Sequence, residues 1–202
     1  MNKLKRDFYE RSTETVAREL LGKILVHETN GIKISGKIVE TEAYLGTIDK
    51  GAHSYGGKRT SRVEVMYGNP GFSYVFMIYG MYYCFNVVTQ KVGIPEAVLI
   101  RALEPVDGIE AMSQNRFNKS YDSLNKRNIL NLTNGPGKLC KALGINKTLN
   151  GEDLLGNQLY IIDNNDTFNI ETTKRIGIDY AEEAKDFPLR FYIKGNKFVS
   201  KV

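Results

Sequence analysis

The chain has 202 residues, which suits one domain with a well-buried core. Hydrophobic residues make up 42% and charged residues 25% of the composition, values typical of globular proteins. No apolar run approaches the roughly 20 residues that a membrane-spanning helix needs. The charged segment 1–18 lacks the apolar stretch of a signal peptide. We therefore expect a single domain over residues 1–202 that stays in the cytoplasm and does not enter a membrane.

The net charge of +5 is unevenly distributed along the chain. Residues 112–147 contain seven basic side chains and one acidic one, whereas residues 148–187 contain nine acidic and three basic ones. A one-sided basic block favours a polyanionic partner such as nucleic acid. A solvated loop and helix face would give the same pattern, so both interpretations stay open.

The two cysteines and two histidines are isolated from one another in the sequence. Cys84 and Cys140 fit reduced, buried thiols, and neither they nor His27 and His53 show the spacing of a zinc site. We therefore expect no disulfide and no bound metal.

The first elements in the chain are a short helix and a β-hairpin. The segment Ser12–Gly22 has a capping residue at its start, an apolar face and a terminating glycine, which predicts a helix. Two β-rich runs, Lys23–Glu28 and Ile32–Ala43, flank an Asn30-Gly31 pair. That pair is a strong signal for a tight hairpin turn.

The middle of the chain predicts three more strands. Phe72–Tyr79 and Met81–Thr89 should meet at a turn near Gly80, and Ala97–Leu103 is an apolar strand.

Helical signals follow the middle strands. Asp107 with Glu110 forms a possible capping box for a helix that runs to about Arg116. The polar segment Lys119–Thr133 is predicted to be a loop.

The last third of the chain contains one more predicted helix and further strands. Asn134-Gly135-Pro136 should open the helix, because proline is favoured in the first turn, and Gly144 should end it. Late strands are predicted at Leu159–Asp163, Leu189–Lys194 and Lys197–Ser200. Strands joined mainly by hairpins, with few helices, indicate an α+β fold around a mixed, mostly antiparallel curved sheet.

The strand around Glu42 carries an unusual pair of carboxylates. Alternate side chains of a strand share a face, so Glu40, Glu42 and Tyr44 should point the same way as Ile38. A carboxylate on a partly apolar face is costly to bury unless it has a partner or a chemical task. The pattern fits a general base aimed at a water molecule, and it also fits two solvated acids on a sheet face.

Aromatic residues are dense between positions 67 and 85. Most of these rings must form core, but one or two could stack on a base, worth about 1–3 kcal/mol each. Tyr79 stands beside Gly80 at the predicted hairpin tip, where a large side chain has little to pack against. It is therefore a candidate wedge into a nucleic-acid duplex.

Two further polar residues stand out. Arg101 lies in the apolar strand Ala97–Leu103 and should pair with a carboxylate, for which Glu42 is a candidate; a structural ion pair remains the alternative. His53 lies in a glycine-rich loop after the Glu42 strand and could line a pocket.

With these residues in place, the chain resembles the alkyladenine (3-methyladenine) DNA glycosylase family, the vertebrate-type enzyme also found in many bacteria. The resemblance runs from about Phe8 to Val199. Each block alone is weak, but together, in order and with family-like spacing, they are specific. The blocks are Val39–Gly46, Ala52–Ser54, Tyr79–Asn86, Leu99–Pro105, Gly135–Cys140 and Pro188–Tyr192.

The resemblance implies an activity and a set of catalytic roles. By position, Glu42 matches the residue that activates the attacking water, and Arg101 matches the residue that helps to hold that water. Tyr79 matches the tyrosine that intercalates into the minor groove and fills the gap left by a flipped nucleotide. The fold implied is a single mixed α/β domain with an antiparallel sheet and a protruding β-hairpin.

The resemblance also implies how the damaged base is bound. Tyr44 and His53 match pocket residues that stack on the flipped base and contact its edge. Asn86 matches a residue that crowds the exocyclic amino group of guanine. Phe76 stands where the vertebrate enzyme has a second stacking tyrosine, so the ring is kept and its hydroxyl is lost. This departure puts the preference for neutral lesions, such as hypoxanthine or etheno-adenine, in question.

We expect excision of alkylated purines, such as 3-methyladenine and 7-methylguanine, from double-stranded DNA. The enzyme would act as a monomer without metal or cofactor, on the bacterial nucleoid. No lysine occupies the matched pocket positions, so hydrolysis without strand cutting is expected. The basic residues Arg59, Arg62 and Lys138 are candidates for phosphate contacts.

Two alternatives from other classes remain at this point. A non-catalytic damage-binding protein would have no need of a Glu42–Arg101 pair. A hydrolase of free modified nucleosides would have no need of an exposed Tyr79 or of a basic block.

Overall fold

The computed structural model describes residues 2–201, and one strand lies at the centre of its fold. Strand β2 (Ile32–Tyr44) pairs antiparallel with β5 (Glu96–Asp107) along one edge. Along its other edge it pairs with β1 (Ile24–Thr29) over residues 32–37 and with β8 (Arg190–Ile193) over residues 40–42. The Glu40–Glu42 segment is therefore enclosed by strands on both edges.

The remaining strands extend the sheet on both sides of β2. Within residues 2–201 the sheet has eight strands, and its continuous order is β3-β4-β5-β2-β1-β6, with β8 joining β2 to β7. All of the pairings are antiparallel. The strands not yet given bounds are β3 (Ser73–Ile78), β4 (Tyr82–Thr89), β6 (Leu159–Ile162) and β7 (Ile170–Thr173).

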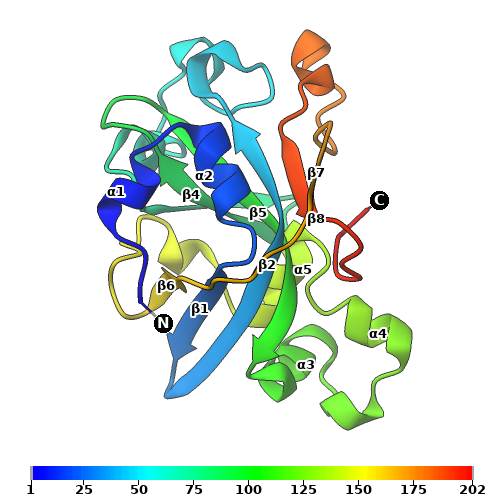
Figure 1. The fold of residues 1–202 in the computed structure, drawn as a ribbon. Helices are drawn as coiled ribbons and strands as arrows, with labels where there is room; N and C mark the ends of the chain where they lie inside the picture. Colours follow the sequence, from blue (N-terminus) through cyan, green and yellow to red (C-terminus); the bar gives the residue numbers. More distant parts are fainter. Residues whose placement is uncertain (1, 202) are drawn as a thin grey trace.

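Helices cover both faces of the curved sheet. In Figure 1, α2 lies in front of the sheet and α5 lies behind it. Both bury apolar side chains against the strands, among them Val16 of α2 and Leu139 of α5. The helices are α1 (Arg6–Tyr9), α2 (Thr13–Glu19), α3 (Ile109–Phe117), α4 (Lys126–Leu130) and α5 (Pro136–Leu143). The predicted α+β class and the mostly antiparallel sheet are confirmed.

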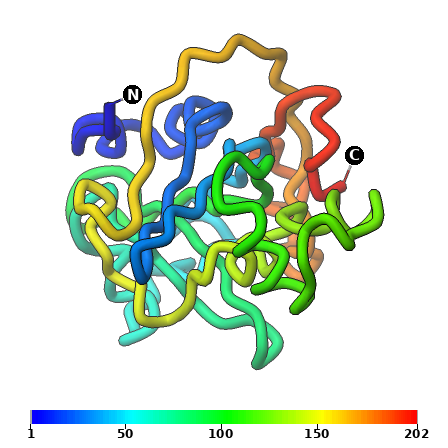
Figure 2. The backbone as a smooth tube through the Cα atoms, turned by 90° about the horizontal axis from the view of Figure 1, so that it is seen from below, coloured from blue at the N-terminus to red at the C-terminus, as the bar shows by residue number. Residues whose placement is uncertain are grey.

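The link between β6 and β7 crosses a long distance without a helix or strand. Figure 2 shows this segment arching over the molecule toward the side where the C-terminal residues lie. It is tied down on the way, since the Asn164 side chain donates to the carbonyl of Gly22 at 3.0 Å and Arg18 donates to Thr172 at 3.1 Å. This path returns the chain to β2 and delivers β7 and β8 to the Glu40–Glu42 segment.

Several turn and cap predictions are confirmed. The hairpin at Asn30-Gly31 joins β1 and β2, and both turn residues have positive φ. Ser12 caps α2, and Gly144 ends α5 in the left-handed conformation. The β3–β4 hairpin turns at Tyr79-Gly80, where both residues again have positive φ.

Other local predictions are wrong. The residue before α3 is Gly108, and Asp107 ends β5 instead of capping the helix. The segment 119–133 contains the short helix α4, which Asn125 caps through its side chain, so it is not a plain loop. Residues Lys197–Ser200 form no strand, because Ser200 binds a side chain from β2 in place of a strand partner.

The glycine before α3 gives a stability prediction. Gly108 has φ +70°, and an added Cβ would lie 2.6 Å from the carbonyl oxygen of Lys33. Gly31 has φ +74° but open space around it. Gly31→Ala should therefore cost only the left-handed penalty, about 1–2 kcal/mol. Gly108→Ala should cost more, because the backbone must also move. Urea unfolding of both variants checks this, and equal shifts would contradict it.

Candidate active site

The two carboxylates of β2 face the same side of the sheet. Thr41, which lies between them, donates its hydroxyl to the carbonyl of Ala17 in α2 at 2.8 Å. Alternation along the strand therefore turns Glu40 and Glu42 away from α2. Both glutamates are fully buried. The predicted face is confirmed, and the alternative of two solvated acids is wrong.

Arg101 lies between the two glutamates and pairs with both. Its Nε donates to Glu40 Oε1 at 3.1 Å, and its Nη1 donates to Glu42 Oε2 at 3.2 Å. The pairing of β2 with β5 is irregular here, because Glu40 pairs with Ala102 and Thr41 pairs with Ile100. Arg101 is therefore an extra residue of β5 with no partner on β2, and an irregularity of this kind can redirect the side chain of the extra residue.

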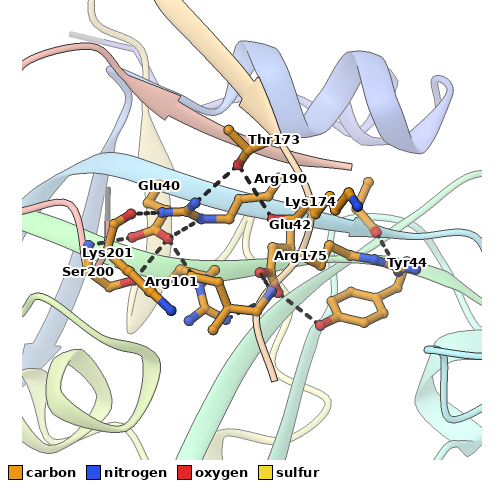
Figure 3. A network of polar contacts seen from close by, with 12 residues as sticks. Glu40, Glu42, Tyr44, Arg101, Thr173, Lys174, Arg175, Arg190, Ser200 and Lys201 are labelled. Carbon is orange, nitrogen blue, oxygen red and sulfur yellow. Dashed lines mark hydrogen bonds and ion pairs between the residues drawn. The ribbon is translucent and has the colours of Figure 1, made fainter. Parts of the chain in front are cut away.

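Glu40 has a second set of partners. Figure 3 shows Arg190 and Ser200 converging on it beside Arg101. Arg190 Nε donates to Glu40 Oε1 at 2.6 Å, and the backbone N–H and hydroxyl of Ser200 donate at 2.7 and 2.9 Å. Burial acts to lower the pKa of Arg101, but the Glu42 and Glu40 carboxylates raise it above its ordinary value. The guanidinium therefore stays charged.

Glu42 accepts three hydrogen bonds. The Tyr44 hydroxyl donates to Oε2 at 2.9 Å beside Arg101, and the backbone N–H of Ile176 donates to Oε1 at 2.8 Å. Burial and the Glu42 charge raise the pKa of Tyr44 well above its usual range, so its hydroxyl remains a donor. A carboxylate has about four acceptor positions, which leaves room on Glu42 for one more donor, such as water.

A cavity of about 570 Å³ opens beside this charged cluster. That volume is within the range of ligand pockets, roughly 300–1,000 Å³. The three residues that donate to Glu42 all line the cavity, and the carboxylate lies behind them. The structure brings most of the sequence-predicted site residues to this cavity. These are Tyr44, His53, Arg62, Phe76, Tyr79, Asn86 and Arg101.

One wall of the cavity is aromatic. Tyr74 and Phe76, on the same face of β3, lie with ring centroids 5.1 Å apart. The His53 ring packs edge-on against Phe76 at 4.6 Å, and its Nδ1 is 2.8 Å from the Tyr74 hydroxyl. The Arg62 guanidinium lies over the Phe76 ring at 5.1 Å. An aromatic, polarisable wall of this kind suits a planar ligand.

The wall carries a neutral histidine. Burial, and then the charges of Arg62 and Lys58, lower the pKa of His53 to about 4. Burial raises the pKa of Tyr74 to about 12 and that of the nearby Cys84 thiol to about 12. At neutral pH these three groups are therefore uncharged, and they offer only hydrogen bonds and apolar surface.

Asn86 and Tyr79 both line the cavity but differ in exposure. The Asn86 side chain is buried and donates to the carbonyl of Tyr74 at 3.0 Å, which fixes its orientation. Tyr79 is 87% exposed at the hairpin turn, with φ +52°. A bulky residue is uncommon in that conformation, and its position at the turn places the aromatic ring outside the core.

Two predicted phosphate contacts lie outside the cavity lining. Arg59 is exposed and pairs with Glu64 at 2.5 Å. Lys138 at the start of α5 donates to Asn131 and Asn134 at 2.6 and 2.8 Å.

Sequence reasoning missed several residues of the site. Tyr74 is a buried core aromatic that also lines the cavity, and its alternation with Phe76 along the strand is the signal that could have singled it out. Arg175 and Asp49 form a buried ion pair beside the cavity, 126 positions apart, and nothing local indicates it. Ile176 contributes through its backbone N–H, so its residue type gives no indication of that role.

The described part of the chain lacks two other kinds of feature. Within residues 2–201, no group of three or more His, Cys, Asp or Glu side chains is placed to hold a metal ion. Among the same residues, none of the helices has the length and apolar character needed to cross a bilayer.

Comparison with known proteins identifies the class. The family described as Methylpurine-DNA glycosylase (MPG) matches residues 7–197. A protein of Desulfitobacterium hafniense is 65% identical over 201 residues, covering 99% of each chain. One of Clostridium acetobutylicum is 61% identical over 199 residues, covering 98% of this chain and 97% of its own. Both carry the name "Putative 3-methyladenine DNA glycosylase".

The family match and the similarity to these relatives identify the chain as a DNA glycosylase, an enzyme of DNA repair. The chain belongs to the methylpurine-DNA glycosylase family. The resemblance noted in the sequence is thereby confirmed.

The neutral histidine gives a prediction about pH. The ring of His53 should titrate near pH 4 by NMR, and Arg62→Met should raise that midpoint by removing a nearby cation. The folded pKa is below the unfolded one, so the unfolded chain binds the extra proton. Folding stability should therefore decrease as the pH falls from about 6.5 toward 4. A midpoint at the ordinary histidine value would contradict the buried environment.

Proposed function

We propose that the protein excises alkylated purines from double-stranded DNA by hydrolysing the bond between base and sugar. The substrates include 3-methyladenine and 7-methylguanine. The observation that carries the proposal is the buried Glu42, which Arg101 and Tyr44 hold directly behind the wall of an aromatic cavity. The enzyme is expected to act as a monomer without a metal or cofactor.

The cavity wall supports binding of a planar, positively charged base. Alkylation at N3 or N7 leaves a cationic purine, and cations are attracted to aromatic faces. Tyr44, Tyr74 and Phe76 line the cavity, and His53 is neutral at physiological pH, so it adds no repelling charge. Phe76 has no hydroxyl to donate to the base. Neutral lesions such as hypoxanthine and etheno-adenine are therefore the substrates for which we expect this pocket to differ most from one with a tyrosine at this position.

The chemical step uses water and one carboxylate. The water oxygen attacks the sugar carbon as the C–N bond breaks, and the bonding electron pair leaves with the purine. The water proton passes to Glu42, which is worth about 10²- to 10⁴-fold as a general base. The sugar develops positive charge in the transition state, as in glycoside hydrolysis, and the carboxylate offsets it. Arg62 and Arg101 line the cavity, and guanidiniums stay protonated. They therefore form no Schiff base with the sugar, and hydrolysis without strand cutting is expected.

The hairpin tip supports entry of the base from a duplex. Flipping a nucleotide out costs a few kcal/mol, and an apolar wedge can offset part of that cost by refilling the stack. Tyr79 lies at the rim of the cavity, and its neighbours Met77 and Met81 are 44% and 66% exposed. This apolar tip is the surface that we assign to the minor groove.

Basic side chains around the site would hold the phosphates. Arg62 lies at the cavity, Lys138 lies at the start of α5, and Arg59 would first have to leave Glu64. An exposed pair of this kind is screened by solvent and adds little stability, so a phosphate could replace Glu64 easily. Binding should weaken as salt increases.

The direct experiment is base release from alkylated duplex DNA, with the freed bases identified by chromatography. The same preparation is tested on free 7-methylguanosine. Release from duplex but not from the nucleoside supports the proposal. Faster release from the nucleoside would show a nucleoside hydrolase instead. Strands that break before any alkaline treatment would overturn the assignment of simple hydrolysis.

Removing the carboxylate should separate binding from chemistry. Glu42→Gln keeps the shape of the side chain and should retain binding to a lesion-containing duplex, while base release falls about 10²- to 10⁴-fold. Glu104→Gln is the matched control, because it alters a partly exposed carboxylate on β5, outside the cavity lining. Normal release by Glu42→Gln would show that another group activates the water.

Shortening the hairpin tip should affect duplex substrates selectively. Tyr79→Ser removes the wedge, so excision from a duplex should fall much more than excision from a single strand, which needs no refilled stack. Tyr55→Ser is the control, since Tyr55 is 44% exposed and lies outside the cavity lining. An equal loss on both substrates would argue against insertion into the duplex.

A further inference from the structure

A second buried ion pair lies beside the Glu42 cluster and is not used in the chemistry proposed above. Arg175 Nη1 donates to Asp49 Oδ2 at 2.5 Å, and Nη2 donates to Asp49 Oδ1 at 2.8 Å. Both side chains are completely buried. A buried pair of this kind adds little stability compared with apolar residues of similar size. The presence of this ion pair at the edge of the site is therefore better explained by a role other than stability.

Asp49 fixes the loop that leads from β2 to the cavity. Besides Arg175, its carboxylate accepts from the backbone N–H of Leu45 at 3.0 Å and from that of Gly51 at 2.8 Å. These bonds span the turn between the Glu42 strand and the His53 loop. The carboxylate is thus the centre of the segment that carries two cavity residues, Tyr44 and His53, at its ends.

Arg175 fixes the opposite segment against the same strand. Its guanidinium donates to the carbonyls of Ala43 and Ala184, both at 3.0 Å, and lies over the Tyr44 ring at 4.7 Å. The next residue along the chain, Ile176, is the one whose N–H donates to Glu42. Figure 3 shows Arg175 beside Tyr44, close to the Glu42 carboxylate.

We propose that Arg175, held by Asp49, is a positioning residue that sets the Tyr44 ring and the Ile176 N–H against Glu42. The proposal rests on the function proposed above. Two of the three donors to Glu42 come from Tyr44 and Ile176. The Arg175 guanidinium lies over the Tyr44 ring, and Ile176 is the next residue after Arg175 in the chain. A small shift of Arg175 would move both donors together. The orientation of the Glu42 carboxylate relative to the attacking water would then change, although Arg175 itself contacts no reacting atom.

The discriminating variant is Arg175→Lys, which keeps the positive charge facing Asp49. A lysine ammonium cannot form the bidentate pair with Asp49, and it has no planar group to stack on the Tyr44 ring. Single-turnover excision with excess enzyme gives two values, the saturating rate and the half-saturating enzyme concentration. We expect the saturating rate to fall about tenfold to a hundredfold, since a 1 Å misplacement can cost about 10²-fold. The half-saturating concentration should change by less than about threefold, since the DNA-facing tip at Tyr79 is unaltered.

The matched control is Lys174→Met, one residue earlier in the chain. Lys174 is 66% exposed and pairs with Asp186 at the surface, away from the cavity lining. Its removal should leave both values unchanged. A melting curve for each variant, together with the fraction of active enzyme, separates positioning from folding. A purely structural role would lower the active fraction and leave the rate of the remaining enzyme intact.

A second variant covers the case in which Arg175→Lys does not fold. The double change Asp49→Asn with Arg175→Gln removes both buried charges at once, so no charge is left unpaired. A folded double variant with a slow saturating rate supports the proposal. A wild-type saturating rate in either folded variant would overturn it. If the unmodified enzyme released no base at all, the failure would be that of the proposed function and not of the positioning role.

Discussion

The structure depends on the pairing of one buried guanidinium with two buried carboxylates. Arg101 cannot be buried alone, and neither can Glu40 or Glu42, because an unpaired buried charge costs about 3–5 kcal/mol. Each of these residues therefore requires the others in place. The irregular pairing of β2 with β5 at this point is the backbone arrangement that lets Arg101 reach both acids.

This constraint gathers parts of the chain that are far apart in sequence. Arg190 of β8 and Ser200 near the C-terminus complete the partners of Glu40, and Ile176 completes those of Glu42. The segments near the C-terminus thus support the strand that carries Glu40 and Glu42. Altering the residues near the C-terminus should consequently change the geometry of the site, because Glu40 would lose hydrogen-bond donors and would no longer hold Arg101 in the same position.

Much of the fold could be predicted from the sequence because its signals are local. An Asn30-Gly31 turn, a left-handed Gly144 after a helix and period-two alternation are all set by sterics within a few residues. The same locality explains the failures. Asp107 followed by Glu110 matches a capping box, yet pairing of Asp107 with Ser35 in the sheet holds it in β5. Long-range pairing overrode the local preference.

For the site, the sequence by itself determined which face of β2 carries Glu42 and that the Arg101 charge needs a carboxylate. Both conclusions follow from alternation and from the cost of burying charge, which are properties of the residues themselves. Only the tertiary structure decided that Arg101 binds two acids, that Ile176 contributes a backbone donor, and that Asp49 meets Arg175. Those contacts join segments up to 134 positions apart. A local sequence pattern cannot predict them, because these residues come together only when the whole sheet has formed.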